Sequence, residues 1–287
     1  MRNIIYRNHR KMEIPCGKHT LKVGDRTLIM GILNVTPDSF SDGGKYNELD
    51  NALKHAKEMI EDGADIIDIG AESTRPGHTV ISDEEEIERL TPIIKALIDE
   101  IDVPISVDTY KPAVAKAVLE LGVPIINDIW GLQRDPEMAK VIAEHDAVVV
   151  AMHNQDGTEY EGDVVDAVAD FLRESIRIGM EAGIPKEKII LDPGVGFGKD
   201  TDQNLEVMSR LGEFNDFGCA VLLGTSKKSM IGNVLDLPPS ERVEGTIATS
   251  VMGTIQGMDI VRVHNVKENY RALKLTDAIV RKTPWKK

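Results

Sequence analysis

The chain has 287 residues and a formal net charge of −14, with 41% hydrophobic but only 4% aromatic residues. So acidic a balance argues against general nucleic-acid binding, which needs basic surface to neutralise phosphates. The length suits a single α/β barrel, a domain that commonly reaches about 250 residues, and aliphatic side chains must fill most of its core.

Cysteine usage and hydropathy indicate the cellular compartment. Cys16 and Cys219 are far apart and have no metal-ligand spacing, so we expect no disulfide framework and a reducing cytoplasm. Residues 1–18 contain no long apolar run of the signal-peptide kind, and no stretch approaches the roughly 20 apolar residues of a membrane span. We therefore expect a cytoplasmic protein without a membrane partner.

The first predicted element of the chain is a hairpin. Residues 13–26 alternate weakly and contain Gly17 and Gly24, which favours a hairpin covering the floor of a barrel. Residues 1–26 are accordingly expected as an N-terminal extension, and residues 27–287 as one barrel domain.

From residue 28 onward, short apolar runs alternate with longer amphipathic ones. The predicted strands are 28–33, 65–69, 104–107, 124–126, 147–152, 188–191, 220–223 and 260–263. The predicted helices are 48–61, 83–99, 111–121, 135–145, 164–182, 202–214, 241–256 and 267–281. Eight strand–helix units predict an α/β fold, the closed (β/α)8 TIM barrel. A doubly wound open sheet, in which fewer strands are expected, is the alternative.

Polar side chains follow almost every predicted strand, where a parallel barrel carries its active site. In strand order they are Asn34, Thr36, Asp38 and Ser39; Glu72, Ser73, Thr74 and Arg75; Asp108; Asn127 and Asp128; Met152 with His153; Asp192; Ser226 to Ser229; and Arg262 with His264. Each of these side chains, taken alone, also has an ordinary structural explanation. Asp108 could cap the next helix, Asn127 or Asp192 could close a turn, and Lys227 and Lys228 could be solvated surface. Their convergence on one rim favours a site.

The chemistry of this rim points to a heterocycle and a phosphate. Asp108, Asn127 and Asp192 lack the His or Cys partners of a transition-metal site and suit the N–H groups of a flat, guanidine-like ring. Lys228 could donate to a ring carbonyl or ring nitrogen. The cations Arg75, Arg262 and His264 suit a phosphate or pyrophosphate, and Asn34 offers an oxygen to a Mg²⁺ held mainly by phosphate and water. The glycines at 194, 196 and 198 predict a tight turn that places Phe197 over the mouth.

Ordered motifs covering residues 31–264 resemble the dihydropteroate synthase family. They are GILNVTPDSFSDGG from Gly31, ESTRPG from Glu72, SVDT from Ser106, INDI from Ile126, LDPGVGFGK from Leu191, SKKSMIG from Ser226 and RVH from Arg262. Each motif alone is modest, but their order and their positions on different strand ends make the resemblance specific. It implies the joining of 6-hydroxymethyl-7,8-dihydropterin pyrophosphate to p-aminobenzoate, with Mg²⁺ as cofactor and a homodimer as the common assembly.

The resemblance also assigns roles to residues. It implies a metal ligand in Asn34 and catalytic roles for Asp38, Lys228 and Arg262. The pterin pyrophosphate would contact Thr74, Asp108, Asn127, Met152, Asp192, Phe197, Lys228, Arg262 and His264. The aminobenzoate would contact Arg75, Pro76, Phe197 and Ser229, the last at the start of a helix. The loop carrying residues 36–41 would act as a lid.

Two departures and three alternatives accompany this reading. The family commonly has Arg where this chain has Lys227, which lacks the planar fork of Arg, and Ala71 stands where Gly is frequent. A pterin-binding methyltransferase would share the Asp/Asn/Asp pattern but would need neither the Asn34 loop nor the pyrophosphate set. A non-catalytic pterin-binding homologue and a purely structural barrel are the other possibilities.

Overall fold

Eight parallel strands close into a barrel in the computed structural model, which describes residues 11–35, 44–72 and 81–284. Their order around the barrel is β10-β3-β4-β5-β6-β7-β8-β9. The strands are β3 (Leu28–Asn34), β4 (Ile66–Gly70), β5 (Ile105–Asp108), β6 (Ile125–Asp128), β7 (Val148–Met152), β8 (Ile189–Asp192), β9 (Ala220–Leu223) and β10 (Ile260–Val263). The predicted TIM barrel is confirmed, and the open-sheet alternative is wrong.

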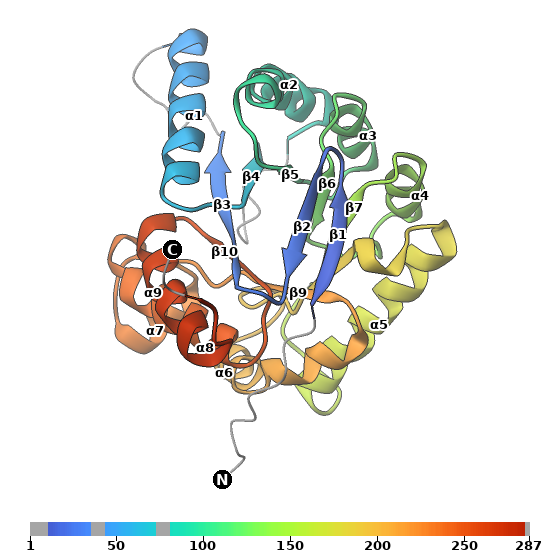
Figure 1. Cartoon of the computed structure of the whole chain (residues 1–287). Coiled ribbons are helices and arrows are strands. Elements are labelled where there is room, and N and C mark those ends of the chain that lie inside the picture. The colour runs from blue at the N-terminus through green and yellow to red at the C-terminus, as the bar shows by residue number, and fades with distance from the viewer. Residues whose placement is uncertain (1–10, 36–43, 73–80, 285–287) are drawn as a thin grey trace.

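The helices ring the barrel on the outside (Figure 1). They are α1 (Gly44–Glu61), α2 (Asp83–Glu100), α3 (Pro112–Glu120), α4 (Pro136–Glu144), α5 (Val164–Ala182), α6 (Thr201–Ser209), α7 (Ser229–Leu235), α8 (Val243–Ile255) and α9 (Val266–Val280). Short 3-10 turns η2 (Lys186–Lys188), η3 (Leu211–Phe217) and η4 (Pro239–Glu241) join some of them. Among the helices of the described residues, none is both long and apolar enough to cross a membrane.

Two of the predicted helices differ from those observed by more than two residues. The helix predicted over 48–61 begins at Gly44. The helix predicted over 202–214 ends at Ser209, because Arg210 leaves the helical region with φ −123° and ψ 19°, and the poor helix former Gly212 follows in η3. The helix predicted over 241–256 begins at Val243, and the short helix α7 precedes it. The other predicted boundaries from 65 to 281 agree to within two residues.

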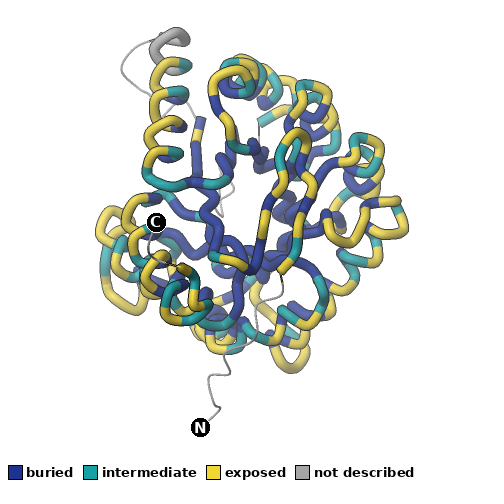
Figure 2. Tube along the Cα trace, in the orientation of Figure 1, coloured by how far each residue is buried: buried dark blue, intermediate teal, exposed yellow. Residues whose placement is uncertain are grey.

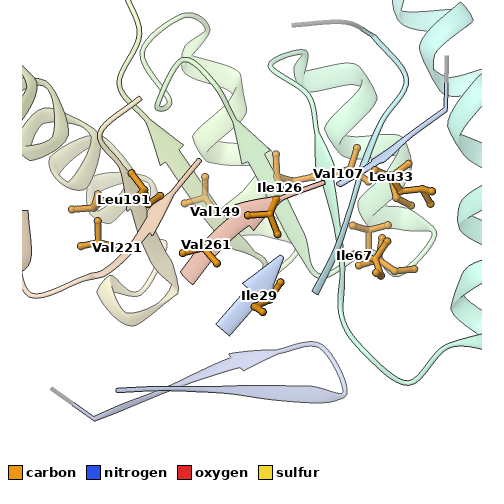
Figure 3. Packing of buried hydrophobic residues seen from close by; sticks show 14 of the residues in the cluster. Ile29, Leu33, Ile67, Val107, Ile126, Val149, Leu191, Val221 and Val261 are labelled. Carbon is orange, nitrogen blue, oxygen red and sulfur yellow. The ribbon is translucent and has the colours of Figure 1, made fainter. Parts of the chain in front are cut away.

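Aliphatic side chains fill the space between the strands and the helices. At least one buried residue from each strand of the barrel faces the helices: Ile29, Leu33, Ile67, Val107, Ile126, Val149, Leu191, Val221 and Val261 (Figure 3). Since the interior of the barrel covers the other face, the strands are buried on both sides, as parallel sheets usually are. Figure 2 shows this as a buried centre inside exposed outer helix faces.

The amino-terminal end of the barrel is closed by the hairpin of β1 (Met12–Cys16) and β2 (His19–Val23). Its inward residues Ile14, Cys16, Leu21 and Val23 share one buried cluster with the barrel residues Leu28, Met30, Ile66, Ile125, Val148, Val150, Ile190, Ala220, Leu222 and Ile260. This confirms the predicted hairpin over the barrel floor, drawn in blue in Figure 1.

Above this apolar floor, the barrel interior becomes polar. Alternate residues of a strand share a face, so the next inward residue after each floor residue lies two positions further along. For Ile66 that residue is Asp68, for Ile125 it is Asn127, for Ile190 it is Asp192 and for Ile260 it is Arg262. The strand pattern therefore places a polar layer at the carboxyl ends of the strands.

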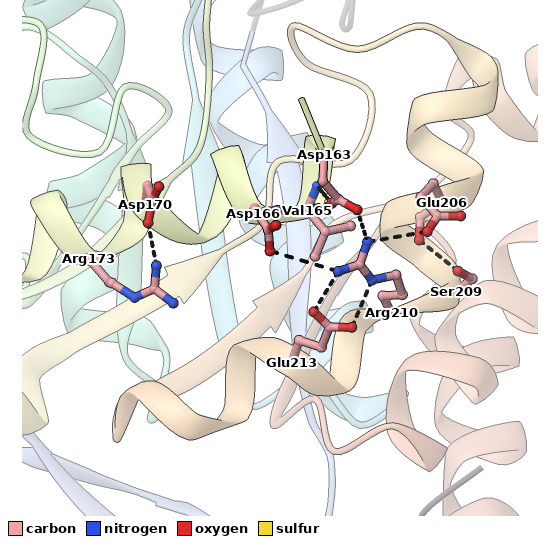
Figure 4. A network of polar contacts seen from close by, with 9 residues as sticks. All are labelled: Asp163, Val165, Asp166, Asp170, Arg173, Glu206, Ser209, Arg210 and Glu213. Atoms are coloured by element: carbon pink, nitrogen blue, oxygen red, sulfur yellow. Dashed lines mark hydrogen bonds and ion pairs between the residues drawn. The ribbon is translucent and has the colours of Figure 1, made fainter. Parts of the chain in front are cut away.

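A second concentration of charge lies on the outside and holds two helices together (Figure 4). Arg210, after α6, contacts Asp163 Oδ2 at the start of α5 through Nη1 at 2.6 Å. It also binds the Glu213 carboxylate at 2.7 and 2.9 Å and lies 3.4 Å from Glu206. Asp163 also caps α5, accepting from the N–H groups of Val165 and Asp166. The charges of this network serve helix packing.

The shared cluster of hairpin and barrel predicts that both unfold together. Ile14→Ala removes a fully buried side chain and should lower the free energy of unfolding by about 2–5 kcal/mol. Chemical denaturation should still show one transition. Thr20→Ala, on the exposed side of β2, is the control and should change stability by less than about 0.5 kcal/mol. A separate early transition of the hairpin would contradict the prediction.

Candidate functional site

An arginine shared by two carboxylates lies at the centre of the polar layer. Arg262 on β10 donates from Nε to Asp68 Oδ2 on β4 at 2.7 Å, and from Nη2 to Asp108 Oδ2 on β5 at 2.8 Å. Asp68 is fully buried and the Arg262 side chain is 20% exposed. The two bonds fix the plane of the guanidinium group across the mouth of the barrel.

Asn127, on β6, joins this group from the other side of Asp68. Its Nδ2 donates to Asp68 Oδ2 at 3.3 Å. The second oxygens, Asp68 Oδ1 and Asp108 Oδ1, are buried and have no hydrogen-bond partner among the described residues. Buried polar atoms are nearly always paired, so these oxygens are acceptors that a ligand N–H or ordered water would satisfy.

Burial and close charges shift the pKa values of this site. Burial raises the pKa of the Asp108 carboxyl, with Arg262 opposing and Asp68 adding to the rise. Burial also raises the pKa of Asp192, against the attraction of Lys228. Burial lowers the pKa of Lys228 to about 8, although Asp192 opposes the shift. Such opposed shifts, gathered in one place, are characteristic of functional sites.

Asp192 both closes a turn and faces the mouth. Its Oδ1 accepts from the Gly194 N–H at 2.7 Å. A methyl group built on Gly224, just after β9, would lie 3.6 Å from Asp192 Oδ2, 3.8 Å from Arg262 Cβ and 3.9 Å from Lys228 Nζ. These three side chains therefore surround one space beside Gly224, and the turn-closing interpretation of Asp192 is only part of its role.

The glycine-rich segment after β8 forms the predicted tight turn. Phe197 N–H donates to Gly194 O at 3.0 Å. Gly194 has φ +66°, and a Cβ there would lie 1.9 Å from His153 O. Gly196 has φ +87°, and a Cβ there would lie 2.6 Å from Lys228 Cδ. Both positions therefore require glycine, the second because Lys228 passes over it.

Lys228 connects this turn to the mouth. Its ammonium group donates to Val195 O and lies 4.4 Å from the centroid of the Phe197 ring, a cation–π contact. Lys228 occupies the position before α7, and the exposed Ser229 is the first residue of that helix. Met152, which ends β7, is buried with Cγ 3.4 Å from the Cβ position of Gly194.

Asn34 and His264 lie at the rim. A methyl group on Gly70 would lie 3.7 Å from Asp108 Cβ and 3.9 Å from Asn34 Oδ1, so the Asn34 amide stands beside Asp108. Asn34 is exposed at the end of β3. His264 Nδ1 lies 2.9 Å from Ser226 Oγ, which also accepts from the His264 N–H at 3.2 Å. The serine thereby orients the imidazole ring.

The structure thus brings together, at one barrel mouth, the predicted residues that it describes: Asn34, Asp108, Asn127, Met152, Asp192, Phe197, Lys228, Ser229, Arg262 and His264. The predicted site residues Asp38, Thr74, Arg75 and Pro76 lie outside the described residues, as does the predicted lid at 36–41.

Two of the purely structural explanations for these side chains are wrong. Asp108 does not cap the next helix, whose cap position is Lys111, without a side-chain cap bond. The turn after β6 is closed by Asp128, which accepts from Trp130 N–H at 2.9 Å and Leu132 N–H at 2.7 Å. Asn127 is therefore left to face inward. Lys227 has φ +59°, and its carbonyl accepts from Arg242 at 2.9 Å, which gives its backbone a structural role.

Sequence reasoning missed two buried residues of this site. Asp68 follows from the alternation of the run IIDIG, because a strand with Ile66 inside also has Asp68 inside. Lys199 donates to Gly194 O and Phe197 O, both at 3.0 Å, and contacts His153 Nδ1 at 2.8 Å. The motif GFGK contains Lys199, but the hydrogen-bond partners of Lys199 are brought together only by the folded structure.

Glu72, expected at the rim, belongs to a buried ion cluster beside it. Lys111 Nζ lies 2.6 Å from Glu72 Oε2, 2.8 Å from Glu86 Oε2 and 2.7 Å from Ile81 O. The Ile81 N–H also donates to Glu72 Oε2 at 3.2 Å. The cluster holds the residues on both sides of 73–80 in place.

Lys199 gives the fold a measurable pH dependence. Burial and the nearby Lys228 lower its pKa from 10.5 to about 7, with Asp192 opposing. Between these values the unfolded chain binds the proton more strongly, so stability should rise with pH, by up to about 1.4 kcal/mol per unit. Urea unfolding of the native chain at pH 7.5 to 9.5 should show this slope.

Lys199→Met is the comparison variant. It should lose the part of the increase in stability with pH that comes from Lys199. Lys186→Met, which changes an exposed lysine, should keep it. Equal slopes in the native chain and the Lys199→Met variant would contradict the assignment.

Comparison with known proteins identifies relatives of the whole barrel. A family model described as "Pterin binding enzyme" matches residues 30–264. A dihydropteroate synthase of Clostridium beijerinckii is 55% identical over 267 residues, covering 93% of this chain and 99% of that protein. The enzyme of Bacillus subtilis is also 55% identical, over 91% of this chain and 92% of its own length.

Solved structures agree. A Clostridium difficile dihydropteroate synthase, crystallised in the presence of pteroic acid, is 58% identical with a TM-score of 0.88, covering 90% of this chain and 98% of its own. A Xanthomonas albilineans dihydropteroate synthase with 4-aminobenzoic acid is 38% identical with a TM-score of 0.89, covering 94% of this chain and 98% of its own.

Proposed function

The chain belongs to the pterin-binding enzyme family, among the dihydropteroate synthases, and we propose how its barrel mouth carries out their reaction. It is a transferase of folate biosynthesis that joins 6-hydroxymethyl-7,8-dihydropterin pyrophosphate to p-aminobenzoate, giving 7,8-dihydropteroate and pyrophosphate. The observation that carries the residue roles is the interior polar layer in which Arg262 bridges Asp68 and Asp108.

The pterin ring lies in this layer. Its amino and ring N–H groups are donors, and Asp108, Asn127 and Asp192 offer acceptors that are already buried, so little is lost in desolvation when the ring binds. Lys228 donates to the carbonyl edge of the ring, and Met152 and Phe197 contact its faces. The unpartnered Asp108 Oδ1 supports this role, because the ring would supply the missing donor.

The pyrophosphate lies at the rim, with Arg262 and His264 around it. The charge of Arg262 and the hydrogen bonds of both side chains stabilise the negative charge that grows on the leaving oxygen as the bond to the CH₂ carbon breaks. The family resemblance assigns Thr74 to the pyrophosphate and a catalytic role to Asp38. The residues present fit a Mg²⁺, because Asn34 Oδ1 is an exposed oxygen beside Asp108 and phosphate oxygens and water would fill the remaining positions. When bound, the ion neutralises phosphate charge.

The aminobenzoate approaches from the solvent side. Ser229 at the start of α7 contacts its carboxylate, and Phe197 packs against its ring. The family resemblance assigns Arg75 and Pro76 to the same substrate. The arylamine nitrogen is nucleophilic without a base, so the proposed reaction needs no side chain that acts as a general base. Nitrogen attacks the CH₂ carbon as pyrophosphate leaves, and the amine then loses its proton. Ring nitrogens held by Asp108 and Asp192 stabilise positive charge at that carbon.

One assay tests the reaction and the role of Asp192 together. Purified chain with Mg²⁺ and both substrates should release dihydropteroate and pyrophosphate. Asp192→Asn keeps the side-chain volume but removes the charge, and should lower kcat/KM by about 100-fold. Asp128→Asn is the matched control, a buried strand-end carboxylate that closes a turn, and should change kcat/KM less than threefold. No product from the unmodified chain would refute the function.

Asn34→Ala tests the metal-binding role. It should weaken Mg²⁺-dependent binding of pterin pyrophosphate at least tenfold while leaving binding of the bare 6-hydroxymethylpterin unchanged, because only the pyrophosphate shares the ion. Titration calorimetry with and without Mg²⁺ measures both affinities. Equal loss of both affinities would mean that Asn34 is structural.

The chain is proposed to act as a homodimer in the cytoplasm. Exposed apolar side chains gather on the three contacting helices α6, α7 and α8, namely Leu205, Val234, Leu235 and Met252. Such a patch is typical of an interface between subunits. The free thiols Cys16 and Cys219 support a reducing compartment.

A charge placed in this patch should separate the dimer. Val234→Asp should convert the protein to monomers in sedimentation velocity at micromolar concentration, because an unpaired charge would be buried in the interface. Leu275→Asp changes an exposed apolar residue on α9 and should leave the dimer intact. Dissociation by Leu275→Asp alone would move the interface to α9.

A further inference from the structure

We propose that Asp68 is a positioning residue that fixes which groups of Asn127 and Arg262 face the pterin, an inference that rests on the function proposed above. Asp68 stands in the middle of β4 rather than at its end, and it is fully buried. The function proposed above gives Asp68 no contact with either substrate, and ordered water can satisfy its free Oδ1.

The first step concerns Arg262. Asp68 Oδ2 accepts from its Nε at 2.7 Å, while its Nη2 reaches Asp108 Oδ2 at 2.8 Å. A guanidinium group is planar, so bonds from two of its nitrogens set its orientation. Without the bond to Asp68, the guanidinium could turn about its Nε and pair with Asp108 in other ways, which would use the acceptors that the pterin needs.

The second step concerns Asn127. An ionised carboxylate only accepts hydrogen bonds, so the Asn127 group turned toward Asp68 Oδ2 must be the NH₂, at 3.3 Å. The amide oxygen of Asn127 is thereby directed away from Asp68, as an acceptor for a ring N–H. A neutral amide at position 68 could donate instead, and Asn127 could then flip and present its NH₂ to the ring.

The third step concerns geometry in the barrel. In the strand order β10-β3-β4-β5-β6, Asp68 lies two strands from Arg262 on one side and two strands from Asn127 on the other. A single oxygen therefore links groups on opposite sides of the mouth. This arrangement makes the acceptor pattern of the pterin site depend on one charge that need not touch the substrate.

The test is Asp68→Asn, which keeps the side-chain volume. We expect kcat/KM for pterin pyrophosphate to fall about 100-fold and the affinity for bare 6-hydroxymethylpterin to fall about tenfold. Asp65→Asn is the matched control. Asp65 also pairs with an arginine, Arg26, and accepts from the Ile29 N–H at 2.9 Å, but at the amino-terminal end of the barrel. It should lower stability and leave both constants within threefold of native.

A double-mutant cycle separates positioning from a structural role. In the Arg262→Lys background, where the fork is absent, Asp68→Asn should cost less than about tenfold in kcat/KM. If Asp68 merely supports the fold, its effect is the same in both backgrounds and follows the loss of stability. Additive effects, or native constants in Asp68→Asn, would overturn the proposal.

Two further measurements keep the outcome decisive. If Asp68→Asn does not fold, Asp68→Ser, which keeps an oxygen acceptor without the charge, should show the same loss of pterin affinity, and native affinity would refute the proposal. The unmodified chain is assayed first. Failure to form dihydropteroate there would count against the proposed function, whereas an active native chain with an equally active Asp68→Asn variant would count against this inference alone.

Discussion

The cost of burying charge governs the architecture of this barrel mouth. An isolated charge inside a protein is unfavourable by several kcal/mol, and it persists only when paired and hydrogen-bonded. Here Arg262 supplies the pairing for Asp68 and Asp108, so strands β10, β4 and β5 must remain in register for any of the three charges to be tolerated. The closed barrel therefore both pairs these charges and assembles the site.

The remaining groups are arranged around that pairing. Asp192 and Lys228 approach from β8 and from the segment after β9, and the turn at 194–197 brings Phe197 to Lys228. Lys199 holds this turn from below through two carbonyls. The outer network of Arg210 is also rich in charge, but its carboxylate partners are largely exposed and it joins helices (Figure 4). The burial of the charges, rather than their number, distinguishes the barrel mouth from the outer network.

The sequence was sufficient to predict the barrel and most of the mouth because both depend on local rules. Hydrophobic period identifies the strands, and their carboxyl ends lie on one rim, which is why Asp108, Asn127, Asp192 and Arg262 could be chosen. The strand end offers both Asn127 and Asp128, and the resemblance assigns the pterin to Asn127; in the structure Asp128 closes a turn. Asp68 does not follow from the position of strand ends, because it lies in the middle of β4.

Other features required the tertiary structure. Gly212 is a local signal for the break after α6, but the ion pair of Arg210 with Asp163 at the start of α5 comes only from the tertiary structure. Lys199 is recognisable as a buried lysine only when His153, Gly194 and Phe197 surround it.

The hairpin that closes the barrel floor has a consequence for the order in which substrates bind. With Ile14 and Leu21 closing the floor, the described part of the barrel interior opens at the carboxyl ends of its strands. In the function proposed above, the pterin ring lies among Asp192 and Asn127, deeper than the aminobenzoate at Ser229. We therefore expect the pterin pyrophosphate to bind before the aminobenzoate, because a bound aminobenzoate would obstruct entry to the deeper position.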